Sequence, residues 1–67
     1  MDRQLYIDAI RGRAVPMHMW RPLENLQLGK VRGGGFVSES WEWNDTALQQ
    51  MPDYGLSALY FDLRANG

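Results

Sequence analysis

The sequence predicts a small α+β domain: a short N-terminal helix, a three- to four-stranded, mainly antiparallel sheet with a glycine-rich hairpin, and a second short helix. Three observations predict it. Apolar residues recur at helical spacing near the N-terminus, three glycines separate two strand-like segments, and apolar residues alternate near the C-terminus. The 67 residues fit one domain spanning residues 1–67, and the 45% apolar content exceeds that of disordered chains.

Residues 2–11 are expected to form the first helix. Asp2 can cap its N-terminus, and Gly12 suits the position after its end. Four apolar residues share one face of this helix: Leu5, Tyr6, Ala9 and Ile10. A strand with Leu5, Ile7 and Ala9 on one side is the alternative, and the Asp start and Gly stop favour the helix.

Residues 13–28 are expected to be irregular. Pro16 and Pro22 each lack a backbone N–H and disfavour a helical conformation in the residue before them. Residues 17–20 between them suit a short extended piece, and one helical turn could follow Pro22.

Residues 28–43 predict a β-hairpin. Residues 28–32 are expected to form the first strand and residues 36–43 the second. The glycines at 33–35 between them allow the positive φ of a tight turn. Four residues of the returning strand share the expected core face: Val37, Glu39, Trp41 and Trp43. Whether Trp41 and Trp43 fill the core or remain exposed at an interface stays open.

The last third predicts a short helix and a final strand. The polar residues 44–46 can cap a helix over residues 47–51, which Pro52 ends. Residues 56–63 read as a strand, with every second side chain facing inward: Ser57, Leu59, Phe61 and Leu63. We expect it to pair antiparallel with residues 36–43, while the connection also permits a parallel crossover.

The composition excludes several classes of protein. Without cysteine there is no disulfide framework and no thiolate metal site, and no run approaches the ~18 apolar residues of a membrane span. The N-terminus lacks a basic start followed by an apolar core, so we expect no secretory leader and a cytoplasmic location. His18 is the single histidine and has no nucleophile or ligand pattern around it. We therefore expect no enzyme, no metal and no cofactor.

Charge is divided unevenly along the chain. Residues 1–32 carry six basic and three acidic side chains, and residues 33–67 carry one basic and five acidic. The two halves can neutralise each other within one fold, or leave a basic surface for an acidic partner or a phosphate.

A proline-containing segment without periodicity supplies the candidate partner-binding residues. They combine cations with methionines and a tryptophan, residue types that are adaptable or frequent at interfaces: Arg11, Arg13, Met17, Met19, Trp20 and Arg21. The alternative is that the methionines close the core while the arginines stay solvated.

The glycine-rich stretch supplies a weaker candidate, an anion contact. Its exposed N–H groups and flanking cations could complement a phosphate: Lys30, Arg32, Gly33 and Gly34. It matches neither the P-loop nor the dinucleotide-binding pattern, so a plain hairpin turn is the main alternative.

We therefore expect this protein to act by binding rather than by catalysis. The leading hypothesis is a non-enzymatic protein-binding module that inhibits or modulates a host protein by occlusion. Compact, cysteine-free chains of this size are common among modulators encoded by phages or mobile elements, and the hypothesis rests on that association. The alternatives are a small nucleic-acid-associated regulator that uses the basic N-terminal half, which is less favoured, and a homo-oligomeric structural subunit stable only as an oligomer.

Overall fold

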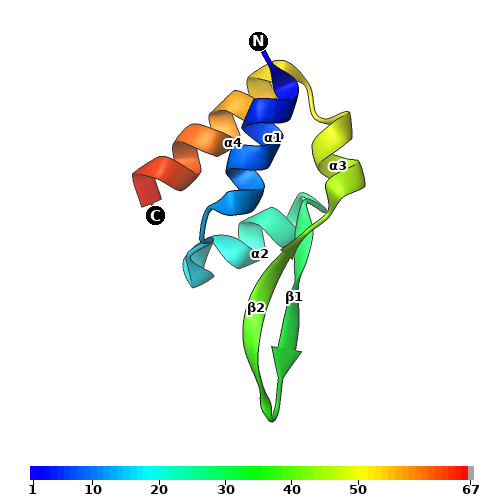
Figure 1. Cartoon of the computed structure of the whole chain (residues 1–67). Helices are drawn as coiled ribbons and strands as arrows, with labels where there is room; N and C mark the ends of the chain where they lie inside the picture. Colours follow the sequence, from blue (N-terminus) through cyan, green and yellow to red (C-terminus); the bar gives the residue numbers. More distant parts are fainter. Residues whose placement is uncertain (67) are drawn as a thin grey trace.

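The computed structural model describes residues 1–66 and has an α+β fold, as the sequence predicts (Figure 1). Its elements, in order, are α1 (Arg3–Gly12), α2 (Met17–Asn25), β1 (Gly29–Gly34), β2 (Val37–Trp43), α3 (Asp45–Gln50) and α4 (Asp53–Asn66). The sheet formed by these residues has two antiparallel strands, so the expectation of three to four strands is wrong.

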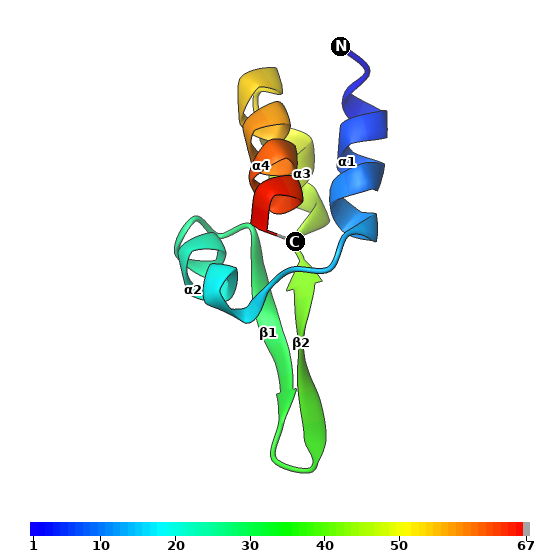
Figure 2. The ribbon, with the colours of Figure 1, turned by 90° about the vertical axis from the view of Figure 1, so that its left-hand side faces the viewer.

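Helix α1 confirms the expectation for residues 2–11. The Asp2 carboxylate accepts hydrogen bonds from the backbone N–H groups of Gln4 and Leu5, which caps the helix. The buried residues of α1 are Ile7 and Ile10, and the helix packs beside α4 (Figures 1 and 2). Leu5, expected on the core face, is exposed.

Helix α2 corrects the expectation that residues 13–28 are irregular. Pro16 precedes the helix and accepts a hydrogen bond from the Met19 N–H, so it starts the helix instead of breaking it. Pro22 lies inside the helix and removes one backbone hydrogen bond. Met19 and Leu23, one helical turn apart, pack into the core, and this burial outweighs the loss.

Strands β1 and β2 confirm the hairpin, which projects from the helices as an arm (residues 29–43; Figures 1 and 2). Gly33, Gly34 and Gly35 all have positive φ, which suits the irregular end of β1 and the turn at residues 35 and 36. Only the base of the arm is partly buried, and residues 32–40 are all exposed. The expected core face therefore holds for Trp41 and Trp43 but is wrong for Val37 and Glu39.

Residues 44–66 form two helices. The Asn44 side chain caps α3 by accepting from the Ala47 N–H, which confirms a short helix here. The strand expected over residues 56–63 is wrong, because α4 occupies residues 53–66. The buried leucines of α4 lie three and four residues apart, which is helical spacing: Leu56, Leu59 and Leu63. Phe61, expected inward, is 54% exposed.

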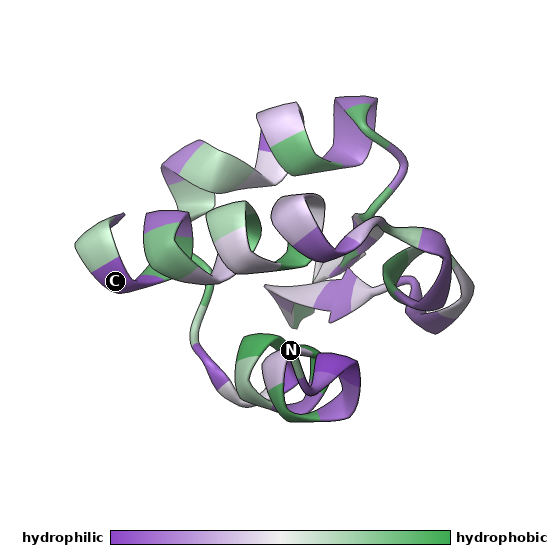
Figure 3. Cartoon of the chain, turned by 90° about the horizontal axis from the view of Figure 1, so that it is seen from above, coloured by the Kyte–Doolittle hydropathy of each residue, from purple (hydrophilic) through white to green (hydrophobic). Residues whose placement is uncertain are grey.

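The core lies among the four helices, which together form the body of the molecule. Its buried residues are Ile7, Ile10, Leu23, Leu28, Leu48, Leu56, Leu59 and Leu63. Seen from above, the helices carry both hydrophobic and hydrophilic stretches, as expected for helices that share a small core (Figure 3). None of the helices in the described chain has the length and apolar character needed to cross a membrane.

Candidate functional site

The end of the arm is the most exposed apolar feature of the described chain. Phe36 is fully exposed and Val37 is 67% exposed, next to the three glycines of the turn. No charged residue occurs between Gly33 and Ser38, a segment that we call the tip. The fold therefore holds an uncharged aromatic anchor away from the body.

The base of the arm is fixed by two tryptophans. The ring of Trp41 lies against Gly29, so closely that a Cβ atom at residue 29 would overlap the ring and the backbone of β2. Trp41 and Trp43 meet edge to face, with ring centroids 5.5 Å apart, and both pack against the core. The buried part of each tryptophan therefore fixes the arm to the body, while the rest of each ring is accessible to solvent.

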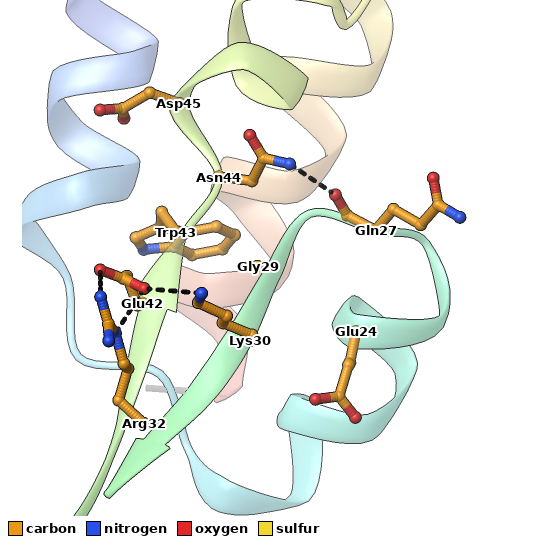
Figure 4. A pocket seen from close by; sticks show the side chains of 9 residues that line it. All are labelled: Glu24, Gln27, Gly29, Lys30, Arg32, Glu42, Trp43, Asn44 and Asp45. Carbon is orange, nitrogen blue, oxygen red and sulfur yellow. Dashed lines mark hydrogen bonds and ion pairs between the residues drawn. The ribbon is translucent and has the colours of Figure 1, made fainter.

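Ion pairs occupy the cations of the candidate anion contact (Figure 4). Arg32 donates to both oxygens of the Glu42 carboxylate at 2.7 and 3.1 Å, and the Lys30 ammonium lies 3.8 Å from the same group. The hydrogen bonds from Arg32 lower the pKa of the Glu42 carboxyl. Gly33 and Gly34 end β1 next to the turn at residues 35 and 36, and the strand register shifts between Arg32 and Gly34. An anion would have to displace Glu42, so the geometry favours the plain hairpin turn.

The residues predicted to bind a partner are divided among several places. Met17, Trp20 and Arg21 lie at helical spacing on α2, where Met17 is 69% exposed and Arg21 is exposed. Trp20 is half-buried, and its indole N–H donates to the Val15 carbonyl at 3.1 Å. Their spacing places these three residues on one side of the helix, which we call the α2 face.

The other three predicted residues do not join the α2 face as free side chains. Met19 packs against the core. Arg11 forms ion pairs with Asp8 at 3.0 Å and with Asp45 at 3.2 Å. Arg13 is half-buried, and its Nε is buried without a hydrogen-bond partner among the described residues.

Sequence reasoning missed an apolar groove between α2 and α4, of about 340 Å³. Its lining includes Met19, Leu23, Leu26, Leu28, Met51 and Leu59. Three of these, Leu23, Leu28 and Leu59, retain 4–7% exposure, while the other five core residues retain at most 1%. The core is therefore least covered at this groove.

Ion pairs between the two halves of the sequence account for much of its charge asymmetry. Arg3 lies 2.6 Å from Asp53, Arg11 pairs with Asp45, and Lys30 and Arg32 pair with Glu42. These contacts support the first interpretation of the uneven charge, in which the two halves neutralise each other.

Comparison of the chain with protein-family models, with curated proteins and with solved structures found no match. Among residues 1–66 there is also no cluster of three or more side chains able to hold a metal ion. The tip, the α2 face and the apolar groove are therefore the candidate functional surfaces of the described chain.

Proposed function

We propose that this protein is a non-enzymatic protein-binding module that docks through the tip of its arm, with Phe36 as the anchor. The observation that carries the proposal is the fully exposed Phe36 on an uncharged turn that projects from the body. A chain of this kind acts by covering a surface of its partner, which is inhibition or modulation by occlusion.

The energetics of the tip support a docking role. Burying a phenylalanine side chain contributes about 1.5–3 kcal/mol, and aromatic anchors dominate many interfaces. Phe36 contributes no such energy to the fold, because it is fully exposed. A small domain has few large apolar side chains available for its core, so a fully exposed phenylalanine suits contact with another molecule.

The α2 face offers a second contact surface. Met17, Trp20 and Arg21 combine an adaptable apolar side chain, an aromatic ring and a cation. Trp20 is held by its hydrogen bond to Val15, so its accessible edge is already ordered before binding. We propose that this face contributes to the same interaction as a weaker contact.

The ion pairs described above make nucleic-acid binding the less favoured alternative. Four of the six cations in the basic half lie within 4 Å of a carboxylate: Arg3, Arg11, Lys30 and Arg32. Phosphate binding needs cations that can exchange their counterions, and here carboxylates compete for them. Retention on DNA or RNA that falls steeply with salt would support this alternative.

Capture of partners from a lysate of the native host tests the proposal. The tagged parent chain is compared with Phe36→Ser and with the matched control Tyr54→Ser, since Tyr54 is a 79% exposed aromatic residue on the body. We expect Phe36→Ser to lose the captured protein and Tyr54→Ser to keep it, with unchanged melting temperatures for both. Equal capture by all three chains would contradict docking through the tip. Loss of capture only in Trp20→Ala or Arg21→Glu would move the site to the α2 face.

A further inference from the structure

We propose that the arm is a regulatory cleavage site. Hydrolysis of the peptide bond between Arg32 and Gly33, by a protease that cleaves after basic residues, ends docking through the tip and leaves the body folded. The position of the cleavage site follows from the exposure and the backbone geometry of the arm. The loss of docking rests on the proposed function, in which Phe36 is the anchor.

The bond after Arg32 lies where the arm holds its backbone least firmly. The strand register shifts between Arg32 and Gly34, so the regular pairing of β1 with β2 ends at Arg32. Three glycines with positive φ follow at residues 33–35, and all of residues 32–40 are exposed (Figure 2). Exposed segments of small residues are where proteases first cut folded chains, so this bond is accessible to them.

Opening this end of the arm disturbs few contacts. The Arg32 side chain is 61% exposed, and the carboxylate of Glu42 that it pairs with is also open to solvent. Exposed ion pairs of this kind add little to stability. Cleavage of a folded chain follows the free energy of local opening, which is lowest where little apolar surface is buried. The end of the arm can therefore open while the core stays packed.

The other bonds after basic residues are better protected. Four of these residues lie within helices, whose hydrogen bonds hold the backbone: Arg3, Arg11, Arg21 and Arg64. Arg13, in the linker between α1 and α2, is half-buried, and its Nε is buried. Lys30 precedes the half-buried Val31 in the regular part of the strand pair. The bond after Arg32 is therefore the one that a protease of this specificity should cut first.

The body is built from both sides of the cut. Four buried core residues precede the arm and four follow it: Ile7, Ile10, Leu23 and Leu28, then Leu48, Leu56, Leu59 and Leu63. Helix α1 packs against α4, and the ion pairs Arg3–Asp53 and Arg11–Asp45 also join the two parts. None of these contacts involves residues 33–36. We therefore expect the pieces 1–32 and 33–67 to stay associated after cleavage.

Hydrolysis changes the tip, because it removes the covalent link between the two strands. One water molecule adds across the bond, so that Arg32 gains a carboxylate and Gly33 gains an amino group. Phe36 then lies three residues from the new amino terminus. A two-stranded hairpin is only marginally stable even when its strands are joined, so the cut end should fray. The partner would then have to order Phe36 on binding, which weakens docking.

Limited digestion of the folded chain with trypsin tests the cleavage site. Mass spectrometry identifies the first products, and we expect the cut after Arg32 to form at least about tenfold faster than any other. Arg32→Gln should abolish this fast cut. The matched control is Arg21→Gln, which removes an exposed arginine of α2 and should leave the fast cut unchanged. A first cut in the helices or after Arg13 would overturn the proposed site.

The purified cleaved chain tests the consequence. Size-exclusion chromatography should show both pieces eluting together, and circular dichroism should show the helices intact. Lysate capture by the cleaved chain should be lost, as it is expected to be for Phe36→Ser. Separation of the pieces, or capture equal to that of the intact chain, would overturn the regulatory role. Capture by the intact chain that does not depend on Phe36 would remove the proposed function, and the digestion and the size of the cleaved chain would still decide the cleavage site.

Discussion

The body and the arm of this protein are held in shape by different physical means. In the body, five of the core side chains are at most 1% exposed, so its structure depends on apolar burial. In the arm, residues 32–40 are all exposed, so its shape depends on cross-strand hydrogen bonds, glycine conformation and the tryptophans at its base. The comparison indicates that stability resides in the helices, while the arm is free to make contacts.

The largest effect is expected where the body loses a fully buried side chain. Leu56→Ala removes a core leucine of α4 and should lower the free energy of unfolding by about 2–5 kcal/mol, enough to unfold much of so small a domain. Leu5→Ala, at an exposed position on α1, is the matched control and should change it by less than about 0.5 kcal/mol. Urea unfolding followed by circular dichroism measures both, and similar losses would contradict the assigned core.

A smaller effect, confined to the arm, is expected from Gly33→Val. Gly33 has φ of +93°, and a Cβ atom there would overlap the Ser38 carbonyl, so the turn should lose about 1–3 kcal/mol of local stability. Hydrogen exchange should show faster exchange of arm amides and unchanged protection in the helices.

Gly12→Ala is the control for this substitution, since nothing lies within 4 Å of a Cβ atom at residue 12. If Gly33→Val lowered the melting temperature of the helices as much as it loosened the arm, the two regions would form one cooperative unit, and the comparison would fail.

Phe61→Ala tests whether the C-terminal segment is a helix with residue 61 facing outward. The Phe61 ring meets the Tyr60 ring edge to face and lies under the Arg64 guanidinium, and Phe61 is 54% exposed. Its loss should therefore lower the free energy of unfolding by less than about 1.5 kcal/mol. Leu63→Ala, at a fully buried neighbouring position, should cost several times more. The reverse order in urea unfolding would support the strand that the alternating pattern predicts.

The smallest effect is expected from pH, and it should appear only in the arm. Arg32 lowers the pKa of Glu42 in the folded state, so the stabilising contribution of this pair is present above the ordinary carboxyl pKa of 4.5. This stabilising contribution is lost as the pH falls from 4.5 through the lower pKa that Glu42 has in the folded state. Arm resonances in an NMR titration should shift in this range, and Glu42→Gln should remove the shift. Unchanged titration of the variant would assign it to another carboxyl group.

The sequence predicts the elements whose signals are local. Asp2 and Asn44 are capping residues next to apolar spacing, and three glycines define a hairpin turn, so α1, α3 and the arm could be predicted. Helix α2 could not, because Pro16 and Pro22 signal irregular structure, and the burial of Leu23 that outweighs them depends on distant contacts.

Helix α4 shows how one pattern can fit two periods. Leu59, Phe61 and Leu63 alternate as in a strand, while Leu56, Leu59 and Leu63 also fit a helix, and only the packing against α1 decides between them. The groove follows from both missed helices, so it could not be predicted. The α2 face was predicted in part, because Met17, Trp20 and Arg21 stay together while Met19 turns to the core.

The exposure of residues 36 and 37 also bears on how this protein can change in evolution. Neither Phe36 nor Val37 is part of the core, so substitutions at these positions leave the packing of the helices intact. Under the proposed docking through the tip, selection on binding and selection on the fold would act on separate stretches of the chain. Designed libraries of binding variants should therefore be placed at these two positions.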